Sequence, residues 1–321
     1  MLRAVLGLAL AVAIAPLFAH AQDTYPNKPI KLVVPFAPGS ATDTVGRTFG
    51  QKMAEILGQP VVVDNKVGAV GIIGAAFVAK SPPDGYTLLV GTNSTNAAVR
   101  MISKNVPYDP VADFTPISFL GVLPQVLVIN NDLPITNMQE FLAYAKAHPS
   151  KLTYSWTSTV TRVATEMLAS GSNVSFFNVP YKTGAAAITD VLTGQVNFTI
   201  VDTIVALPQI NGGKVRAIAV TSLNRIPQLP NVPTIAESAN LPGYELLGIF
   251  AAFGPANLPP DVLAKLNAAV IKAGADPELR AKLAATGLDA QTTTSEQLRQ
   301  RFEQETAKWT KVATDAKIEP Q

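Results

Sequence analysis

Short apolar segments of strand length alternate with amphipathic segments of helix length along most of this 321-residue sequence. This alternation begins at Tyr25 and predicts a parallel sheet covered by helices on both faces, because parallel strands need long crossover connections. We expect strands at 30–34, 61–64, 86–90, 126–129, 152–156, 176–179, 196–201, 215–221 and 244–253. We expect helices at 42–57, 68–80, 137–147, 163–169, 185–192, 261–273, 277–285 and 295–315, and a loop in the proline-rich section 229–242.

The strand and helix series starts again at Leu152, which predicts two α/β domains around a cleft. The apolar segments 122–130 and 244–254 are the natural crossovers between them, so the first domain is discontinuous. We assign residues 22–122 plus 247–321 to domain 1 and residues 123–246 to domain 2. Two crossover strands can act as a hinge that closes around a ligand.

The first 21 residues have the pattern of a signal peptide. Arg3 supplies the positive start, residues 4–18 are nearly all apolar, and Ala19-His20-Ala21 is an A-x-A cleavage site. The apolar run is too short for a membrane-spanning helix. We expect cleavage after Ala21 and export of a soluble mature chain.

Composition argues against several kinds of site. The sequence has no cysteine, and His148 is the only histidine left after cleavage, so neither thiolate chemistry nor a multi-histidine metal site is available. Lysine plus arginine number 25 and aspartate plus glutamate 23, with no basic stripe, so no nucleic-acid partner is expected. We expect no enzyme activity, metal or cofactor, although carboxylate or lysine catalysis stays open.

The segment 31–43 (KLVVPFAPGSATD) predicts a strand, a tight turn and the polar start of a helix. Ser40, Thr42 or Asp43 can cap or precede the first helical turn. Backbone N–H groups at such a turn point at one spot, and the helix dipole adds partial positive charge there. Because this arrangement binds anions without a basic side chain, we hypothesise that the loop holds a carboxylate.

Two other segments have competing interpretations. The polar segment 91–96 follows a strand, where ligands bind in doubly wound sheets, but it is equally typical of an ordinary capped helix start. The glycines of 68–74 follow G-x-x-G-x-x-G with no Walker lysine, so we expect a turn and close helix packing there rather than a nucleotide site.

Short motifs run through nearly the whole mature sequence. They are YPNKPI at 25–30, PFAPG at 35–39 with Asp43, GQPVVVDN at 58–65, PDGYTLLVGT at 83–92, PYDPVADF at 107–114, VPYK at 179–182, LPNVPT at 229–234 and PGYE at 242–245. In their order and spacing they resemble the Bug-type periplasmic solute receptors, the binding subunits of tripartite tricarboxylate transporters.

The resemblance implies a type II periplasmic-binding-protein fold, in which two α/β domains close on a small carboxylate. The implied partners are that ligand and the permease subunits of an inner-membrane tripartite transporter, and we expect a periplasmic monomer. In such receptors the first loop clasps one carboxylate by backbone amides. The segments matching 91–96 and 155–162 face it from the two domains, and an acidic residue matching Asp202 lines the cleft.

The sequence departs from this family where ligand specificity is decided. Ser40 and Ala41 stand where successive glycines are usual, and the second-domain loop reads SWTSTVT at 155–161. Arg162 replaces a residue that is commonly neutral or histidine. The candidate ligand-binding residues are Phe36, Pro38, Gly39, Ser40, Ala41, Thr42, Thr92, Asn93, Ser94, Thr95, Trp156, Thr157, Ser158, Thr159, Thr161, Arg162 and Asp202.

Several of these side chains also have a structural interpretation. Arg162 can bind a ligand carboxylate bidentately or instead pair with Glu166, four residues on. Trp156 can cover a ligand or simply belong to the core. Asp202 can accept a bond from a ligand or cap the next helix, whereas Asp43 is expected to be a helix-start residue because its charge would repel a carboxylate.

Three functions therefore compete at this point. The first is a periplasmic receptor for an organic carboxylate, expected to be a dicarboxylate, with an aromatic acid left open by Trp156 and Arg162. The second is a ligand sensor that docks on a signalling protein when closed. The third is a small periplasmic enzyme.

Overall fold

The computed structural model describes residues 25–315 and residue 320, so the expected signal peptide lies outside the described residues. Within this described part, no helix is both long and apolar enough to cross a membrane.

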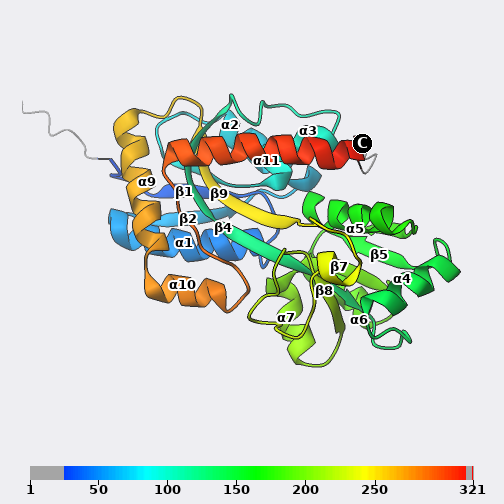
Figure 1. Cartoon of the computed structure of the whole chain (residues 1–321). Coiled ribbons are helices and arrows are strands. Elements are labelled where there is room, and N and C mark those ends of the chain that lie inside the picture. The colour runs from blue at the N-terminus through cyan, green and yellow to red at the C-terminus, as the bar shows by residue number, and fades with distance from the viewer. Residues whose placement is uncertain (1–24, 316–319, 321) are drawn as a thin grey trace, which may run out of the picture.

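The described residues form two sheets that share one long strand, β4 (Phe114–Ile129). The first sheet has the order β2 (Val61–Asn65), β1 (Ile30–Val34), β3 (Thr87–Thr92), β9 (Leu247–Pro255) and β4. The second continues from β4 through β7 (Phe198–Asp202) and β5 (Thr153–Trp156) to β6 (Phe177–Pro180), while β8 (Arg216–Val220) also pairs with β4. Figure 1 shows the two sheets as separate lobes joined along β4 and β9.

The expectation of a parallel sheet throughout is wrong, because β4 and β9 run antiparallel to their neighbours. Only β1 with β2 and β3, and β5 with β6 and β7, are parallel. The sequence predicted only the last four residues of β4, since Pro116 and Pro124 interrupt the earlier apolar run. The strand accommodates Pro116 where its pairing with β9 shifts register, as prolines within sheets usually require.

Helices cover both lobes. They are α1 (Ala41–Leu57), α2 (Ile72–Ala79) after the 3-10 turn η1 (Ala69–Gly71), the π-helical turn η2 (Asn93–Ala97), α3 (Val99–Ile102), α4 (Met138–Ala147), α5 (Thr159–Ser172), α6 (Gly184–Leu192), α7 (Thr203–Asn211), α8 (Ile235–Ser238), α9 (Pro260–Gly274), α10 (Pro277–Ala284) and α11 (Ser295–Asp315). The section 229–242, expected to be a loop, contains α8. This short helix forms because Thr234 and Glu237 make a reciprocal capping box.

Capping residues set where the site-forming helices begin. Ser40 caps α1, and Gly58 ends it in the left-handed conformation at φ +69°, as the sequence predicted. Helix α5 starts at Thr159, four residues before the predicted start. Ser158 is its N-cap, and the buried Thr161 completes a capping box with it, so the polar run belongs to the first turn of the helix.

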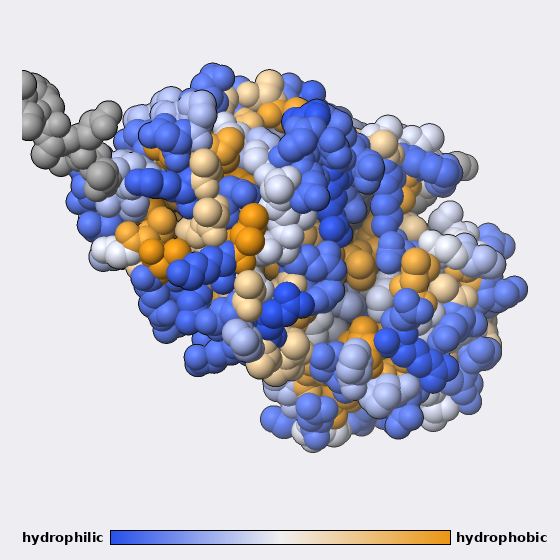
Figure 2. Space-filling view, turned by 60° about the vertical axis from the view of Figure 1, so that its left-hand side comes forward, coloured by the Kyte–Doolittle hydropathy of each residue, from blue (hydrophilic) through white to orange (hydrophobic). Residues whose placement is uncertain are grey.

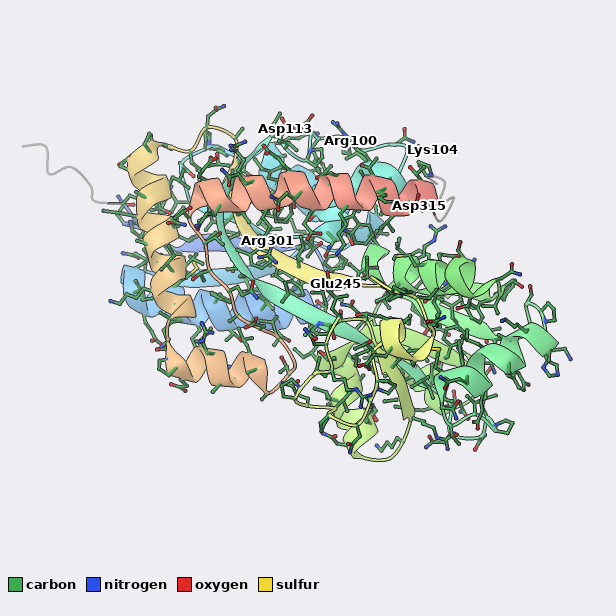
Figure 3. The ribbon with its side chains drawn as sticks, in the orientation of Figure 1. Arg100, Lys104, Asp113, Glu245, Arg301 and Asp315 are labelled. Carbon is green, nitrogen blue, oxygen red and sulfur yellow. The ribbon has the colours of Figure 1, made fainter. Side chains whose placement is uncertain are left out.

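Helix α11 packs across β4, η2 and α3 and buries Trp309, which is 1% exposed. The Arg301 guanidinium lies 3.9 Å from the centre of the Phe119 ring of β4, and Figure 3 shows Arg301 extending from α11 toward that strand. Lys308 forms a 3.2 Å ion pair with Glu245, just before β9. Hydrophilic side chains cover much of the face seen in Figure 2, with scattered apolar patches. Helix α11 therefore fastens the C-terminal part of the chain to the shared strand.

Candidate functional site

An interdomain cavity of about 60 Å³ lies where five helices begin. The starts of α1 and η2 reach it from the first lobe, and those of α5, α6 and α7 from the second. Its lining residues are Phe36, Ala37, Ser40, Ala41, Thr42, Thr92, Asn93, Ser94, Thr157, Ser158, Val160, Lys182, Thr183, Gly184, Asp202, Val205, Gly248, Ile249 and Phe250. Helix N-termini carry partial positive charge, so this arrangement favours an anion.

The caps leave backbone N–H groups available at this cavity. Ser40, Ser158 and Thr183 each accept from the N–H of the third helical residue, which leaves the first two N–H groups of each helix outside the cap. Within the described residues, no partner is seen for the N–H groups of Ala41 or Thr42 at α1. Both residues line the cavity, so they provide donors for a bound anion.

The loop between β1 and α1 is held by Asp43, which is 4% exposed. Its carboxylate accepts from the Gly39 N–H at 3.0 Å, from Asn65 Nδ2 at 2.9 Å and from Arg47 Nε at 2.9 Å. Asn65 Nδ2 also donates to the Phe36 carbonyl at 3.0 Å. Burial would raise the pKa of Asp43, but these hydrogen bonds outweigh it and hold the pKa below its ordinary value. Asp43 is a helix-start residue that fixes the loop, as the sequence predicted.

The segment 91–96 is a capped helix start, and part of it also faces the cavity. Thr92, Asn93 and Ser94 line the cavity. The Asn93 side chain is used to position β9: its Oδ1 accepts from the Ile249 N–H at 2.8 Å, and its Nδ2 donates to the Leu247 carbonyl at 3.3 Å. Ser94 Oγ accepts from the Thr159 N–H at 3.3 Å, which joins the two lobes.

Asp202 brings a carboxylate to the second-lobe wall. It is the N-cap residue of α7, but its side chain makes no capping hydrogen bond. Burial raises the pKa of Asp202, and a 3.2 Å hydrogen bond from Gln125 Nε2 opposes this with a smaller lowering effect. Lys182 lines the same cavity and adds the positive charge of an ammonium group. A ligand here meets both a cation and a carboxyl group that is more easily protonated than usual.

The structure places the other candidates elsewhere. Pro38, Gly39, Thr95, Trp156, Thr159, Thr161 and Arg162 do not line the interdomain cavity. Thr95 and Thr161 are fully buried and bond to their own helix starts. The Arg162 guanidinium lies 5.4 Å from the centre of the Trp156 ring. Glu166 accepts from Tyr154 Oη at 2.5 Å instead of pairing with Arg162.

Sequence reasoning missed about half of the lining. The missed residues are Ala37, Val160, Lys182, Thr183, Gly184, Val205, Gly248, Ile249 and Phe250. The sequence carried a signal for Thr183, since it is a polar residue between a predicted strand and a predicted helix, the same signal that marked the first loop. The β9 residues carry no such signal, because their place at the cavity depends on how β9 crosses between the lobes.

Comparison with known proteins shows which family has this architecture. The family model of the tripartite tricarboxylate transporter family receptor (TctC) matches residues 45–317. A solved R. palustris protein, Rpa4515 with adipate, superposes with a TM-score of 0.89 at 33% identity and covers 92% of this chain and 100% of that one.

Two other solved structures are similar. The periplasmic binding protein BugD gives a TM-score of 0.87 at 33% identity over 92% of this chain and 100% of BugD. MatC from Rhodopseudomonas palustris, with bound malate, gives a TM-score of 0.84 at 32% identity over 90% of this chain and 100% of MatC. The two-domain periplasmic-binding-protein fold implied by the resemblance is confirmed. The chain belongs to the TctC family of tripartite tricarboxylate transporter receptors, a family of periplasmic solute-binding proteins rather than enzymes.

Proposed function

We propose that this protein is a periplasmic receptor that captures an organic carboxylate in the interdomain cavity and delivers it to a tripartite tricarboxylate-type permease in the inner membrane. The observation that carries the proposal is the meeting of five helix N-termini at one cavity. The similar proteins solved with adipate and malate support a carboxylate, and specifically a dicarboxylate, as the ligand class.

Each domain has a role in this proposal. The free N–H groups at Ala41 and Thr42 hold one carboxylate from the first domain. The starts of α5 and α6, with Lys182, receive the second acidic group. Phe36 and Phe250 provide apolar surface for the carbon chain between the two groups. A dicarboxylate of short chain therefore satisfies both walls when the domains close.

Closure needs a hinge, and the two crossover strands supply one. We keep residues 22–122 plus 247–321 as domain 1 and 123–246 as domain 2. Strand β4 pairs with β9 up to Pro124 and with β7 from Gln125 onward. This change of partner supports the first boundary. The start of β9 at Leu247 supports the second. Rotation about these points would open and close the cavity.

A thermal-shift screen of the mature chain tests this function. The panel contains aliphatic, hydroxylated, amino and aromatic mono- and dicarboxylates, with matched amides as uncharged controls. A ligand that binds only the folded state must raise the Tm as its concentration exceeds the Kd. We expect a rise with dicarboxylates and none with the amides. No shift with any carboxylate contradicts the proposal, and product formation from a bound acid contradicts the receptor role.

A further inference from the structure

A second cavity, of about 140 Å³, is lined by residues that the interdomain cavity does not use. We call it the Arg162 cavity. Its lining residues are Ala69, Val70, Ile102, Ser103, Trp156, Thr159 and Arg162. The first four come from η1, the end of α3 and its C-cap Ser103 in the first lobe, and the last three from the end of β5 and the first turn of α5. The cavity therefore lies between the lobes, beside the start of α5.

Three polar atoms on the second-lobe side of the Arg162 cavity are buried without a hydrogen-bond partner in the described residues. They are Trp156 Nε1, Thr159 Oγ1 and Arg162 Nε. Thr159 is only 1% exposed as a whole residue. An indole N–H and a guanidinium N–H can only donate, and a hydroxyl can also donate. Leaving such groups unpaired is costly, so each of the three lacks an acceptor that a bound anion would supply.

The described residues do not supply that acceptor from their own carboxylates. Among them, no acidic residue lines the Arg162 cavity. Glu166, which sits one turn after Arg162, accepts the Tyr154 hydroxyl at 2.5 Å. Arg162 also lies in the first turn of α5, where a helix dipole disfavours a cation. An external anion would pair the charge of Arg162 and satisfy the neighbouring donors together.

We propose that the Arg162 cavity binds the carboxylate group of a small organic acid at a site separate from the interdomain cavity. Guanidinium and carboxylate match each other as bidentate partners, and Trp156 and Thr159 complete the set of donors. This inference does not rest on which ligand occupies the interdomain cavity. It gives Trp156, Thr159 and Arg162 a binding role in a different place from the one that the sequence predicted.

Because both lobes form its walls, an anion in the Arg162 cavity favours the arrangement that brings the lobes together. The 3.3 Å hydrogen bond from the Thr159 N–H to Ser94 Oγ already joins the lobes between the two cavities. Occupation of the Arg162 cavity should therefore tighten binding in the interdomain cavity, and the coupling must be reciprocal.

3-Bromobenzoate tests this proposal, since it is a carboxylate whose unreactive aryl bromine can be located by anomalous scattering. Crystals of the mature protein are soaked in 3-bromobenzoate, and the same ligand is titrated calorimetrically in solution. We expect bromine in the Arg162 cavity and binding there in solution. Arg162→Met should lose that bromine peak and weaken this binding by more than about tenfold. Arg100→Met, which removes a nearby exposed cation that does not line the cavity, should change neither.

Thr159→Val keeps the side-chain shape without the hydroxyl, and so replaces Arg162→Met if that variant fails to fold. The proposal is overturned if wild-type crystals show no bromine in the Arg162 cavity, or if both variants keep full occupancy there. Bromine in the crystal without matching binding in solution would mean an adventitious additive only. That result also overturns the proposal. Bromine in the Arg162 cavity alone, with the interdomain cavity refusing every carboxylate, contradicts the proposed function but supports this inference.

Discussion

Gln125 and Asp202 lie directly opposite each other on β4 and β7, and the Gln125 amide donates to the Asp202 carboxylate at 3.2 Å. Gln125 is fully buried, and it is the residue at which β4 leaves the first sheet and enters the second. Asp202 faces the interdomain cavity from the end of β7. The acidic group that the described residues bring to the proposed site is therefore held by the strand that joins the two domains.

Replacing Asp202 with asparagine should stabilise the ligand-free protein at pH 7. Burial raises the pKa of Asp202 in the folded state, so its ionisation destabilises the fold as pH rises above the ordinary aspartate pKa. The Tm difference between Asp202→Asn and wild type should be largest at neutral pH and shrink toward pH 4. Melting curves across this range measure it, and a difference that grows on acidification contradicts the assignment.

Asp43→Ala should lower the free energy of unfolding by about 1–3 kcal/mol, because the Gly39 N–H and Asn65 Nδ2, which are only partly shielded from water, lose a charged acceptor. The pKa of Asp43 is lowered in the folded state, so its stabilisation is present above the ordinary aspartate pKa and is lost as pH falls through the folded value. Urea unfolding at pH 7 and pH 3 should therefore show a loss that is smaller at pH 3. Asp84→Ala, at an exposed carboxylate, is the control and should cost little.

Asn93→Ala should weaken ligand binding and cost about 1–3 kcal/mol of stability, because the buried Ile249 N–H loses its acceptor. We expect the effect on binding to arise through the position of β9, because the side-chain oxygen and nitrogen of Asn93 both bond to that strand. Urea unfolding and calorimetric titration with a dicarboxylate identified by the screen measure the two effects. Full affinity in a destabilised variant would show that β9 is positioned without Asn93.

Lys182→Gln should reduce affinity for a dicarboxylate about three- to tenfold at low salt, and less at high salt. Lys182 is exposed at the cavity mouth, where salt screens its attraction to an anion. Lys214→Gln removes an exposed lysine outside the cavity lining and serves as the matched control. Equal effects of the two substitutions would indicate a net-charge effect rather than a local role for Lys182.

Local sequence signals predicted the elements that each lobe builds from neighbouring residues. The strand 30–34 has the predicted bounds, and α1 begins one residue before the predicted start, because an apolar run followed by Ser40 as a cap fixes both. The same signals marked Thr92 and Ser158, which the structure places at the cavity. β4 was largely missed, since Pro116 is accommodated there by a register shift and the strand is held by partners distant in sequence.

The sequence by itself determined the alternation of strands and helices, the capped helix starts and the family to which the chain belongs. These depend on periodicity, turn residues and short motifs, which act over a few neighbouring residues. Only the tertiary structure decided which of those helix starts share one cavity and that Arg162, with Trp156 and Thr159, lines another. The reason is geometric: Val160 and Thr159 are adjacent in the sequence, but their side chains leave α5 in different directions.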